Sequence, residues 1–336
     1  MATELQVAAR ALYDDALIWD DHAGFGPDPS VDLNRLAIWK NAGINYLSIN
    51  VGYDRMDWRD TVKSLAAFRR WIRASDAYEL VGTVDEIEPA RKAGKMACTF
   101  DLEGMNALDG SVDMVEFYYD LGVRQMLFAY NKNNQAGGGC HDEDTGLSAF
   151  GREVVAEMNR TGMVIDCSHC AYTTSMEAME MSSAPTIFSH SNARALRDHE
   201  RNITDDQAKA CAANGGVIGV VSLDLFMTDG EATEEILADH IDHYVNLVGV
   251  DHVGIGLDYA WDDEENDDGG NELAETIAKN RDFWPARQYP DRPVRFLPPD
   301  CLPRLTEILL ERQYAEGDVR AILGGNFMRV ARQVWK

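Results

Sequence analysis

The run KMACTFDLEG at residues 95–104 is a nearly continuous apolar segment that ends on an acidic side chain. Three further runs end in the same way on a side chain that can bind a metal: DDH at 20–22, DCSH at 166–169 and FSH at 188–190. In a TIM barrel the carboxyl ends of the parallel strands meet on one face, so residues far apart in the sequence converge there. The pattern predicts one buried metal site assembled from several strand ends.

Short apolar runs alternate with longer helical patterns along the chain, which is typical of βα units around a parallel sheet. Eight strands are predicted, at 16–22, 44–52, 95–104, 124–130, 162–169, 185–190, 216–222 and 252–258. Helices are predicted at 31–41, 58–74, 111–121, 149–161, 204–214 and 233–249, and two more within 302–336. No linker or compositional break interrupts the pattern. We therefore expect an α/β fold, a (β/α)8 TIM barrel of the metal-dependent hydrolase type, as a single domain over residues 1–336 with C-terminal helices.

Composition narrows the classes of partner. A net charge of −26 and a pI near 4.5 repel phosphate backbones and anionic lipids, which argues against nucleic-acid and membrane binding. The amino-terminal residues show no signal peptide, and the scattered cysteines show no disulfide framework, so we expect a cytoplasmic location. The acidic run WDDEENDDGGNE at 261–272 is expected to be a solvated loop, with a calcium site as the alternative.

The candidate metal ligands are the side chains at the ends of these runs: His22, Glu103, His169 and His190. Asp258 ends the eighth predicted strand and adds a further carboxylate. Glu103 is the best candidate to bridge two ions, because a carboxylate has two oxygens and a neutral imidazole offers one lone pair. Two bridged ions lie about 3.5–4 Å apart and lower the pKa of a shared water toward about 7.

Other polar residues have less specific interpretations. The loop at 131–146 follows the fourth predicted strand and is a candidate lid or specificity loop. Within it, His141 is either a substrate contact or a solvent-exposed residue. Cys167 packs in the core or approaches the site. Structural roles are expected for three further histidines, His240, His243 and His252.

Several longer motifs carry a resemblance to a known family. They are GLSAFG at 146–151, DCSHCAY at 166–172, APTIFSHSNAR at 184–194, RNITDD at 201–206 and IGLDY at 255–259. On these motifs the chain resembles the membrane (renal) dipeptidase family of zinc metallopeptidases over nearly its whole length. The resemblance implies a (β/α)8 barrel that holds two zinc ions over the strand ends, and a homodimer as the expected assembly.

The resemblance also implies roles for individual residues. Glu103 is then the bridging ligand, His169 and His190 bind one ion, and His22 binds the other. Arg201 is implied as the clamp on the terminal carboxylate of the substrate. Asp258 is implied as the acid that handles the proton of the attacking water. Arginine grips carboxylates bidentately, and an aspartate beside an activated water can accept and deliver its proton.

The chain departs from the family pattern at two positions. The family's first motif is His-x-Asp, whereas this chain reads His22, Ala23, Gly24, so the carboxylate ligand of the first ion is missing. Asp20 or Asp21 is a possible replacement. Strand alternation places Asp20 and His22 on one face, so Asp20 is alternatively the acceptor that orients His22.

The second departure is Tyr130, which stands where the family has a histidine that binds and polarises the substrate. A tyrosine can still donate a hydrogen bond to a developing oxyanion, so Tyr130 is a candidate for both catalysis and substrate binding. With three ligands left at the second position, a single-zinc hydrolase is chemically sufficient.

The leading hypothesis is a zinc-dependent, dipeptidase-like hydrolase, with one or two ions per chain, that cleaves the amide bond of a dipeptide or related small molecule with a free carboxylate. One alternative is an amidohydrolase that acts on a non-peptide amide or lactam. The other is a degenerate homologue that uses the barrel as a binding module.

Overall fold

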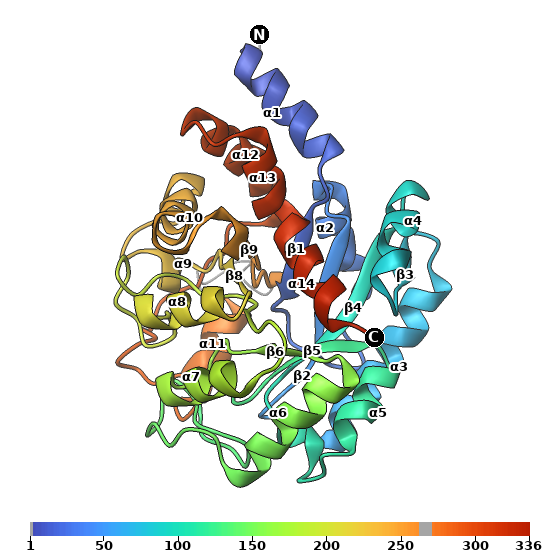
Figure 1. Cartoon of the computed structure of the whole chain (residues 1–336), viewed down its shortest axis with the longest axis vertical. Coiled ribbons are helices and arrows are strands. Elements are labelled where there is room, and N and C mark those ends of the chain that lie inside the picture. Colours follow the sequence, from blue (N-terminus) through green and yellow to red (C-terminus); the bar gives the residue numbers. More distant parts are fainter. Residues whose placement is uncertain (1–2, 262–270) are drawn as a thin grey trace.

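The barrel wall consists of eight parallel strands in a computed structural model that describes residues 3–261 and 271–336 (Figure 1). The predicted (β/α)8 barrel is confirmed, and each predicted strand range overlaps an observed strand. In spatial order the strands are β1 (Trp19–Ala23), β2 (Tyr46–Tyr53), β4 (Met96–Glu103), β5 (Val123–Leu127), β6 (Val164–Asp166), β7 (Ile187–Phe188), β8 (Val217–Val220) and β9 (Val253–Ile255).

One strand outside the wall was not predicted. The strand β3 (Tyr78–Leu80) pairs in parallel with β4 and lies off the barrel path. The wall closes where the segment after β9 meets β1. There Ala23 and Tyr259 form a parallel bridge, and the Asp258 amide donates to the His22 carbonyl at 3.1 Å.

Helices follow the strands around the wall (Figure 1). The structure reproduces two predicted helices residue for residue: α3 (Trp58–Ala74) and α6 (Ala149–Thr161). Each begins after a side chain that caps a free backbone amide, Asp57 for α3 and Ser148 for α6, which fixes the start of the helix.

The other α-helices are α1 (Glu4–Asp15), α2 (Ala37–Ala42), α4 (Ile87–Lys92), α5 (Met114–Asp120), α7 (Tyr172–Met181), α8 (Asp205–Ala213), α9 (Asp224–Met227), α10 (Glu234–Val248), α11 (Glu272–Lys279), α12 (Leu302–Glu311), α13 (Glu316–Arg320) and α14 (Asn326–Val334). The predicted tail of two helices is divided further, because a π-helical turn at Ala321–Gly325 separates α13 from α14.

The helix α14 covers the amino-terminal end of the barrel, where it lies across the strands in Figure 1. Its residue Phe327 packs with Trp19 and with inward-facing residues of β6, β7 and β8 in one buried apolar cluster. Gly254 leaves room for the Phe327 ring, since a Cβ at that position would overlap it. The opposite, carboxyl end of the barrel carries the polar residues.

Two sequence predictions concern the chain as a whole. All six cysteines are free, and Cys167 lies buried in the apolar core. No helix among the described residues has the length and apolar character needed to cross a membrane.

The acidic run at 261–272 falls mostly on residues 262–270, outside the described residues.

Candidate functional site

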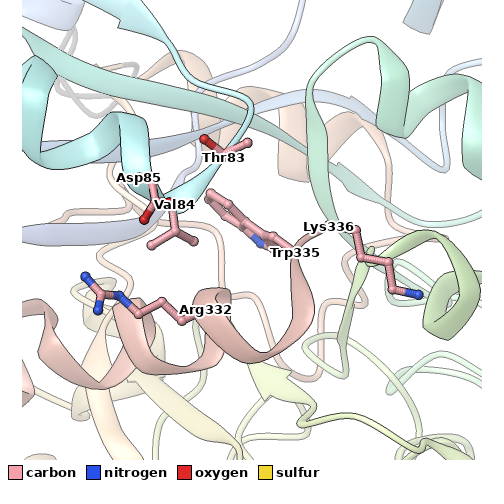
Figure 2. A pocket seen from close by; sticks show the side chains of 6 residues that line it. All are labelled: Thr83, Val84, Asp85, Arg332, Trp335 and Lys336. Atoms are coloured by element: carbon pink, nitrogen blue, oxygen red, sulfur yellow. The ribbon is translucent and has the colours of Figure 1, made fainter.

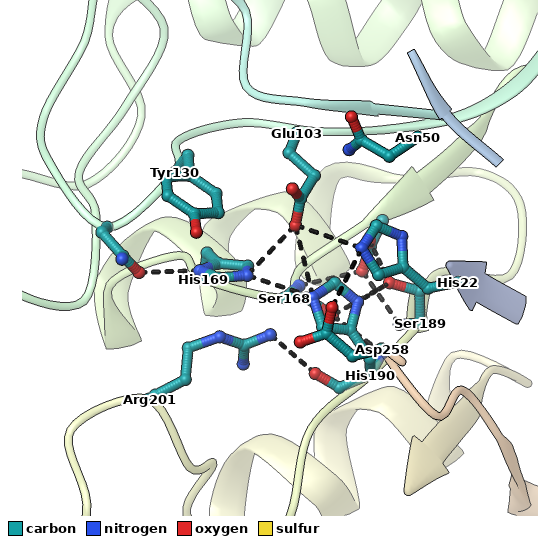
Figure 3. Close-up of polar contacts among 12 residues, drawn as sticks. His22, Asn50, Glu103, Tyr130, Ser168, His169, Ser189, His190, Arg201 and Asp258 are labelled. Atoms are coloured by element: carbon teal, nitrogen blue, oxygen red, sulfur yellow. Dashed lines mark hydrogen bonds and ion pairs between the residues drawn. The ribbon is translucent and has the colours of Figure 1, made fainter. Parts of the chain in front are cut away.

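The side chains predicted to bind metal converge at the carboxyl ends of the strands (Figure 3). His22 lies on β1 and Glu103 is the last residue of β4. The other three follow short strands and enter the site from loops: His169 after β6, His190 after β7 and Asp258 after β9. At His169 and Asp258 the backbone is left-handed, with φ of 62° and 57°, which turns the chain sharply where each strand ends.

One carboxylate oxygen lies at the centre of the site. Glu103 Oε1 is 3.2 Å from His169 Nε2, 3.4 Å from His190 Nε2 and 3.5 Å from His22 Nε2. On the other side of His22, Asp258 Oδ1 is 3.5 Å from the same Nε2. The side chains can hold metal in two sets that share His190, one with Glu103 and His169 and the other with His22 and Asp258.

The second nitrogen of two of these histidines has a hydrogen-bond partner. His169 Nδ1 lies 2.7 Å from Asn131 Oδ1, and the Asn131 amide nitrogen donates to the Phe283 carbonyl, which fixes the oxygen toward the histidine. His190 Nδ1 lies 2.7 Å from Ser189 Oγ, whose own proton goes to Asp166. Both contacts place the proton on Nδ1 and leave the Nε2 lone pair directed into the site.

His22 has the same arrangement with a carboxylate. Its Nδ1 lies 3.2 Å from Asp101 Oδ1, and the other oxygen of Asp101 accepts from Ser48 at 2.6 Å. Its Nε2 is buried and has no hydrogen-bond partner.

These contacts test whether the residues fit a metal centre. With Nδ1 protonated, the Nε2 lone pairs of His169 and His190 face each other at 3.0 Å, and both face Glu103 Oε1. Lone pairs at such distances repel unless a cation lies among them, and an ion there would also give the buried Nε2 of His22 the partner that it lacks. The donor set of imidazole and carboxylate suits zinc. The residues therefore fit the metal that the sequence predicted.

The charges in the site agree with this fit. Burial, with the nearby charge of Arg201, lowers the pKa of His169 and of His190 well below 6.5, so both rings are neutral and able to bind metal at neutral pH. Burial also raises the pKa of Glu103 to about 8, because its charge is poorly solvated. For His22 burial lowers the pKa, but Asp101 and Glu103 more than reverse this. A cation bound in this site would compensate the buried negative charge of these carboxylates.

Asp20 and Asp21 do not replace the missing ligand. The Asp20 carboxylate accepts from the Trp39 indole at 2.9 Å and from the Leu257 amide at 2.8 Å, so it faces α2 and β9. Asp21 accepts from the Trp19 indole at 2.7 Å, at the other end of the barrel interior. The prediction that Asp20 orients His22 is wrong, because Asp101 has that position. The register of β1 shifts between Asp20 and Ala23, so strand alternation does not hold there.

Arg201 lies beside the metal ligands and is only 2% exposed. Its guanidinium donates to Ser191 Oγ at 2.9 Å and to the His190 carbonyl at 2.7 Å. Its Nε is buried and has no hydrogen-bond partner, so the site contains a donor that lacks an acceptor. A carboxylate would supply that acceptor.

Tyr130 lies over His169, with ring centroids 4.2 Å apart. Burial raises the pKa of its phenol well above 10, so the hydroxyl keeps its proton. Aromatic rings that sequence reasoning did not assign to the site pack around it, namely Tyr53, Phe283 and Trp284. The last two come from the segment after α11, which has no distinctive motif.

The loop at 131–146 is fixed by the same segment. His141, for which exposure was one of the two predictions, is 6% exposed. Its Nδ1 lies 2.8 Å from Glu200 Oε2 and its Nε2 lies 3.0 Å from the Tyr289 hydroxyl. The other three histidines assigned structural roles pack against backbone carbonyls or an exposed aspartate.

A separate pocket of about 200 Å³ lies near the carboxyl terminus (Figure 2). Its lining residue Trp335 packs against Trp19 and Tyr46 at the amino-terminal ends of β1 and β2. Asp85 is its one carboxylate side chain, and no histidine lines it. Because this end of a TIM barrel generally contributes stability, we assign the chemistry to the other end.

Comparison with known sequences points to one family. The family model described as membrane dipeptidase (peptidase family M19) matches residues 28–271. An uncharacterized dipeptidase of Schizosaccharomyces pombe is 36% identical over 211 residues, which are 60% of this chain and 51% of that protein. Dipeptidase 3 of Rattus norvegicus is 31% identical over 289 residues, which are 84% of this chain and 53% of that protein. The chain thus spans about half the length of these relatives.

Solved structures share the fold. An amidohydrolase from Pseudomonas aeruginosa superposes with a TM-score of 0.85 and 28% identity, covering 97% of this chain and 99% of that one. A metallo peptidase from Rhodobacter sphaeroides, liganded with a phosphinate mimic of the dipeptide L-Ala-D-Ala, has a TM-score of 0.74 and 19% identity over 96% of this chain and 100% of that one.

Proposed function

Because the chain belongs to the membrane dipeptidase family (peptidase family M19), we propose that it is a zinc-dependent hydrolase of dipeptides or dipeptide-like amides with a free carboxylate. The observation that carries the proposal is the convergence of the Nε2 lone pairs of His22, His169 and His190 on Glu103 Oε1. A metal ion bound among these atoms would satisfy all of them at once.

The ligands divide between two positions. Glu103, His169 and His190 would hold one zinc ion, and His22 would contribute to a second, with Glu103 shared between them. When bound, zinc supplies Lewis acidity that polarises a carbonyl and acidifies water near neutral pH. Asn131, Ser189 and Asp101 each hold a histidine in the orientation that this role needs.

Asp258 is the group proposed to move the proton. Burial raises the pKa of its carboxyl, although His22 and Arg201 partly oppose the shift. A carboxylate with a raised pKa accepts a proton from water more readily and can then deliver it to the nitrogen of the leaving amine. Its side chain remains 16% exposed, so it faces the open side of the site.

Two residues are proposed to hold the substrate. Arg201, with its unpartnered Nε, would bind the terminal carboxylate. Tyr130 would donate a hydrogen bond from its phenol to the carbonyl oxygen of the scissile amide, where negative charge develops. Arg201 and Tyr130 would thus hold the substrate by its terminal carboxylate and by its scissile carbonyl. The cytoplasmic location and the homodimer remain predictions.

The test is hydrolysis of a dipeptide panel by the zinc-reconstituted protein and by His190→Ala. We expect the variant to lose both bound zinc and turnover. The matched control is His243→Ala, which removes a histidine that contacts Asp205 on the outer helices. Full activity in His190→Ala would exclude this site. Turnover restricted to N-acyl amino acids or lactams would reject the dipeptide substrate while keeping a hydrolase.

A further inference from the structure

The carboxylate that the family places two residues after the first histidine has no space in this chain. A Cβ at Gly24 would lie 2.5 Å from the carbonyl oxygen of Asp258 and closer still to its Oδ1. Real Cβ atoms do not approach neighbouring atoms so closely. Position 24 is therefore a glycine because the Asp258 carboxylate occupies the adjoining space.

Barrel closure holds that carboxylate in place. The Asp258 amide donates to the His22 carbonyl at 3.1 Å, and the Gly24 amide donates to the Tyr259 carbonyl at 3.1 Å. These two bonds align the segment after β9 with the end of β1. The left-handed backbone at Asp258, with φ of 57°, lies between them.

The space next to Asp258 contains a metal-ligating atom without a partner. His22 Nε2 is buried, accepts no hydrogen bond, and lies 3.5 Å from Asp258 Oδ1 and 3.5 Å from Glu103 Oε1. The Nδ1 side of the ring faces Asp101, so Nε2 faces the two carboxylates. Figure 3 shows Asp258 and Glu103 approaching His22 from different strand ends.

We propose that Asp258 supplies the carboxylate of the first metal position, in place of the residue missing at 24. His22 and Asp258 lie in one set with His190, and Glu103 Oε1 is 3.5 Å from His22 Nε2. With Glu103 shared between the two ions, the first position would have three protein ligands, His22, Asp258 and Glu103, which is the number typical of catalytic zinc sites. The loss of the His-x-Asp motif is thus a relocation of one carboxylate from β1 to the end of β9. One oxygen of the Asp258 carboxylate would bind the ion, and the other would remain to move the proton. The inference rests on the proposed metal centre and adds the ligand that completes it.

The experiment counts metal rather than activity. Protein stripped with chelator is re-equilibrated with zinc, and bound zinc per chain and affinity are measured by elemental analysis and by competition with a chromophoric chelator. We expect two zinc ions in the unchanged protein and one in Asp258→Asn. The affinity lost at the first position should be at least the roughly 10–100-fold that follows loss of a supporting contact to a metal ligand. His169→Ala should instead remove the other ion.

A second variant keeps the test independent of the Asp258 substitution. Gly24→Ala keeps every ligand residue but introduces a Cβ that displaces the Asp258 carboxylate, so it should also lose the first ion. Gly26→Ala is the matched control, since a Cβ there meets nothing within 4 Å. Visible spectra of the cobalt-substituted proteins should show the loss of one coordination environment in Asp258→Asn and in Gly24→Ala.

Each outcome decides a separate question. Two ions in Asp258→Asn, with activity lost, would overturn the inference and leave Asp258 as a proton carrier in an intact hydrolase. A single ion in the unchanged protein would overturn it as well, whether or not dipeptides are cleaved. Two ions in the unchanged protein and one in Asp258→Asn, without any dipeptide turnover, would support the inference and contradict the proposed function.

Discussion

The hydrogen-bond partners of the site residues determine what each side chain can contribute. Each metal-facing histidine has its Nδ1 occupied by a different group: a carboxylate for His22, an amide for His169 and a hydroxyl for His190. For His169 and His190 this arrangement fixes the tautomer, so their Nε2 lone pairs point inward before any ligand arrives. Preorganisation of this kind is expected where a site must bind metal and perform chemistry.

Arg201 gives a prediction that separates binding from chemistry. Arg201→Met should lower kcat/KM for a dipeptide roughly 10–100-fold, because hydrogen bonds to a charged group contribute about 1.5–3 kcal/mol. The same dipeptide with an amidated carboxyl terminus is the control substrate. The variant and the unchanged protein should differ little on it. An equal loss on both substrates would contradict the carboxylate clamp and assign Arg201 a structural role.

His199 predicts a pH dependence of stability. Its Nδ1 accepts from the Arg201 amide at 3.1 Å and its Nε2 lies 3.1 Å from the Gln288 carbonyl, so the neutral ring satisfies both contacts. Burial, with a smaller effect of His141, lowers the pKa of His199 from 6.5 to about 3. Because the unfolded chain takes up this proton at the higher pH, the contribution to stability is full above pH 6.5 and declines as pH falls toward 3.

Urea unfolding of the chelated protein at pH 7.5 and pH 5 checks this prediction. His199→Gln keeps a donor and an acceptor but cannot take up the proton. Its loss of unfolding free energy between the two pH values should be smaller by about 2 kcal/mol, since one pKa unit corresponds to about 1.4 kcal/mol. His243→Gln is the control at a partly exposed histidine. Identical pH dependence in the two variants would refute the role of His199.

At the scale of elements, the two ends of the barrel have separate tasks. The carboxyl end carries the ligands on short strands and loops, and the amino-terminal end is filled by α14. The register shift in β1 contributes to the site at the carboxyl end. It allows a strand that buries Trp19 and Asp21 at one end to present His22 at the other.

Substitution of Phe327 tests whether α14 stabilises the barrel. Phe327→Ala should lower the free energy of unfolding by about 3–5 kcal/mol, because a fully packed aromatic ring leaves a cavity. Zinc per chain should be unchanged, since the ring lies at the end of the barrel away from the ligands. Phe117→Ala is the control, as that ring is 43% exposed. Loss of zinc in the folded Phe327→Ala variant would show that the two ends are not independent.

The elements also show how far the sequence predicts this molecule. The eight strands and the barrel follow from apolar runs separated by helical patterns, and α3 and α6 begin and end where helical spacing predicts. The strand β3 escaped prediction because it is three residues long and lies outside the barrel path. The orientation of Asp20 was predicted wrongly because strand alternation fails at a register shift.

Within the site, the candidate metal ligands at the strand ends could be predicted from the sequence. Most of the residues that orient or surround them could not. The position of Asp101 could have been predicted, since it precedes Glu103 by two residues on a strand and so shares its face. Those of Asn131 and of the rings of Phe283 and Trp284 could not. Their positions depend on how the loop after β5 meets the segment after α11, and contacts between distant loops leave no local pattern.

At the scale of the whole molecule, charge and site agree. The chain has a net charge of −26, and the site gathers the carboxylates of Glu103 and Asp258 around three histidines. Such a field attracts divalent cations and repels anionic polymers. The carboxylate of the proposed substrate would meet a local positive charge at the buried Arg201.

The measurement that tests the central claim most directly is a zinc titration of the chelated protein with dipeptide hydrolysis as the readout. The account predicts no turnover without metal and a rise in rate that ends at two equivalents of zinc per chain. Hydrolysis at full rate in the metal-free protein, or a zinc-loaded protein that cleaves no dipeptide in a broad panel, would contradict it.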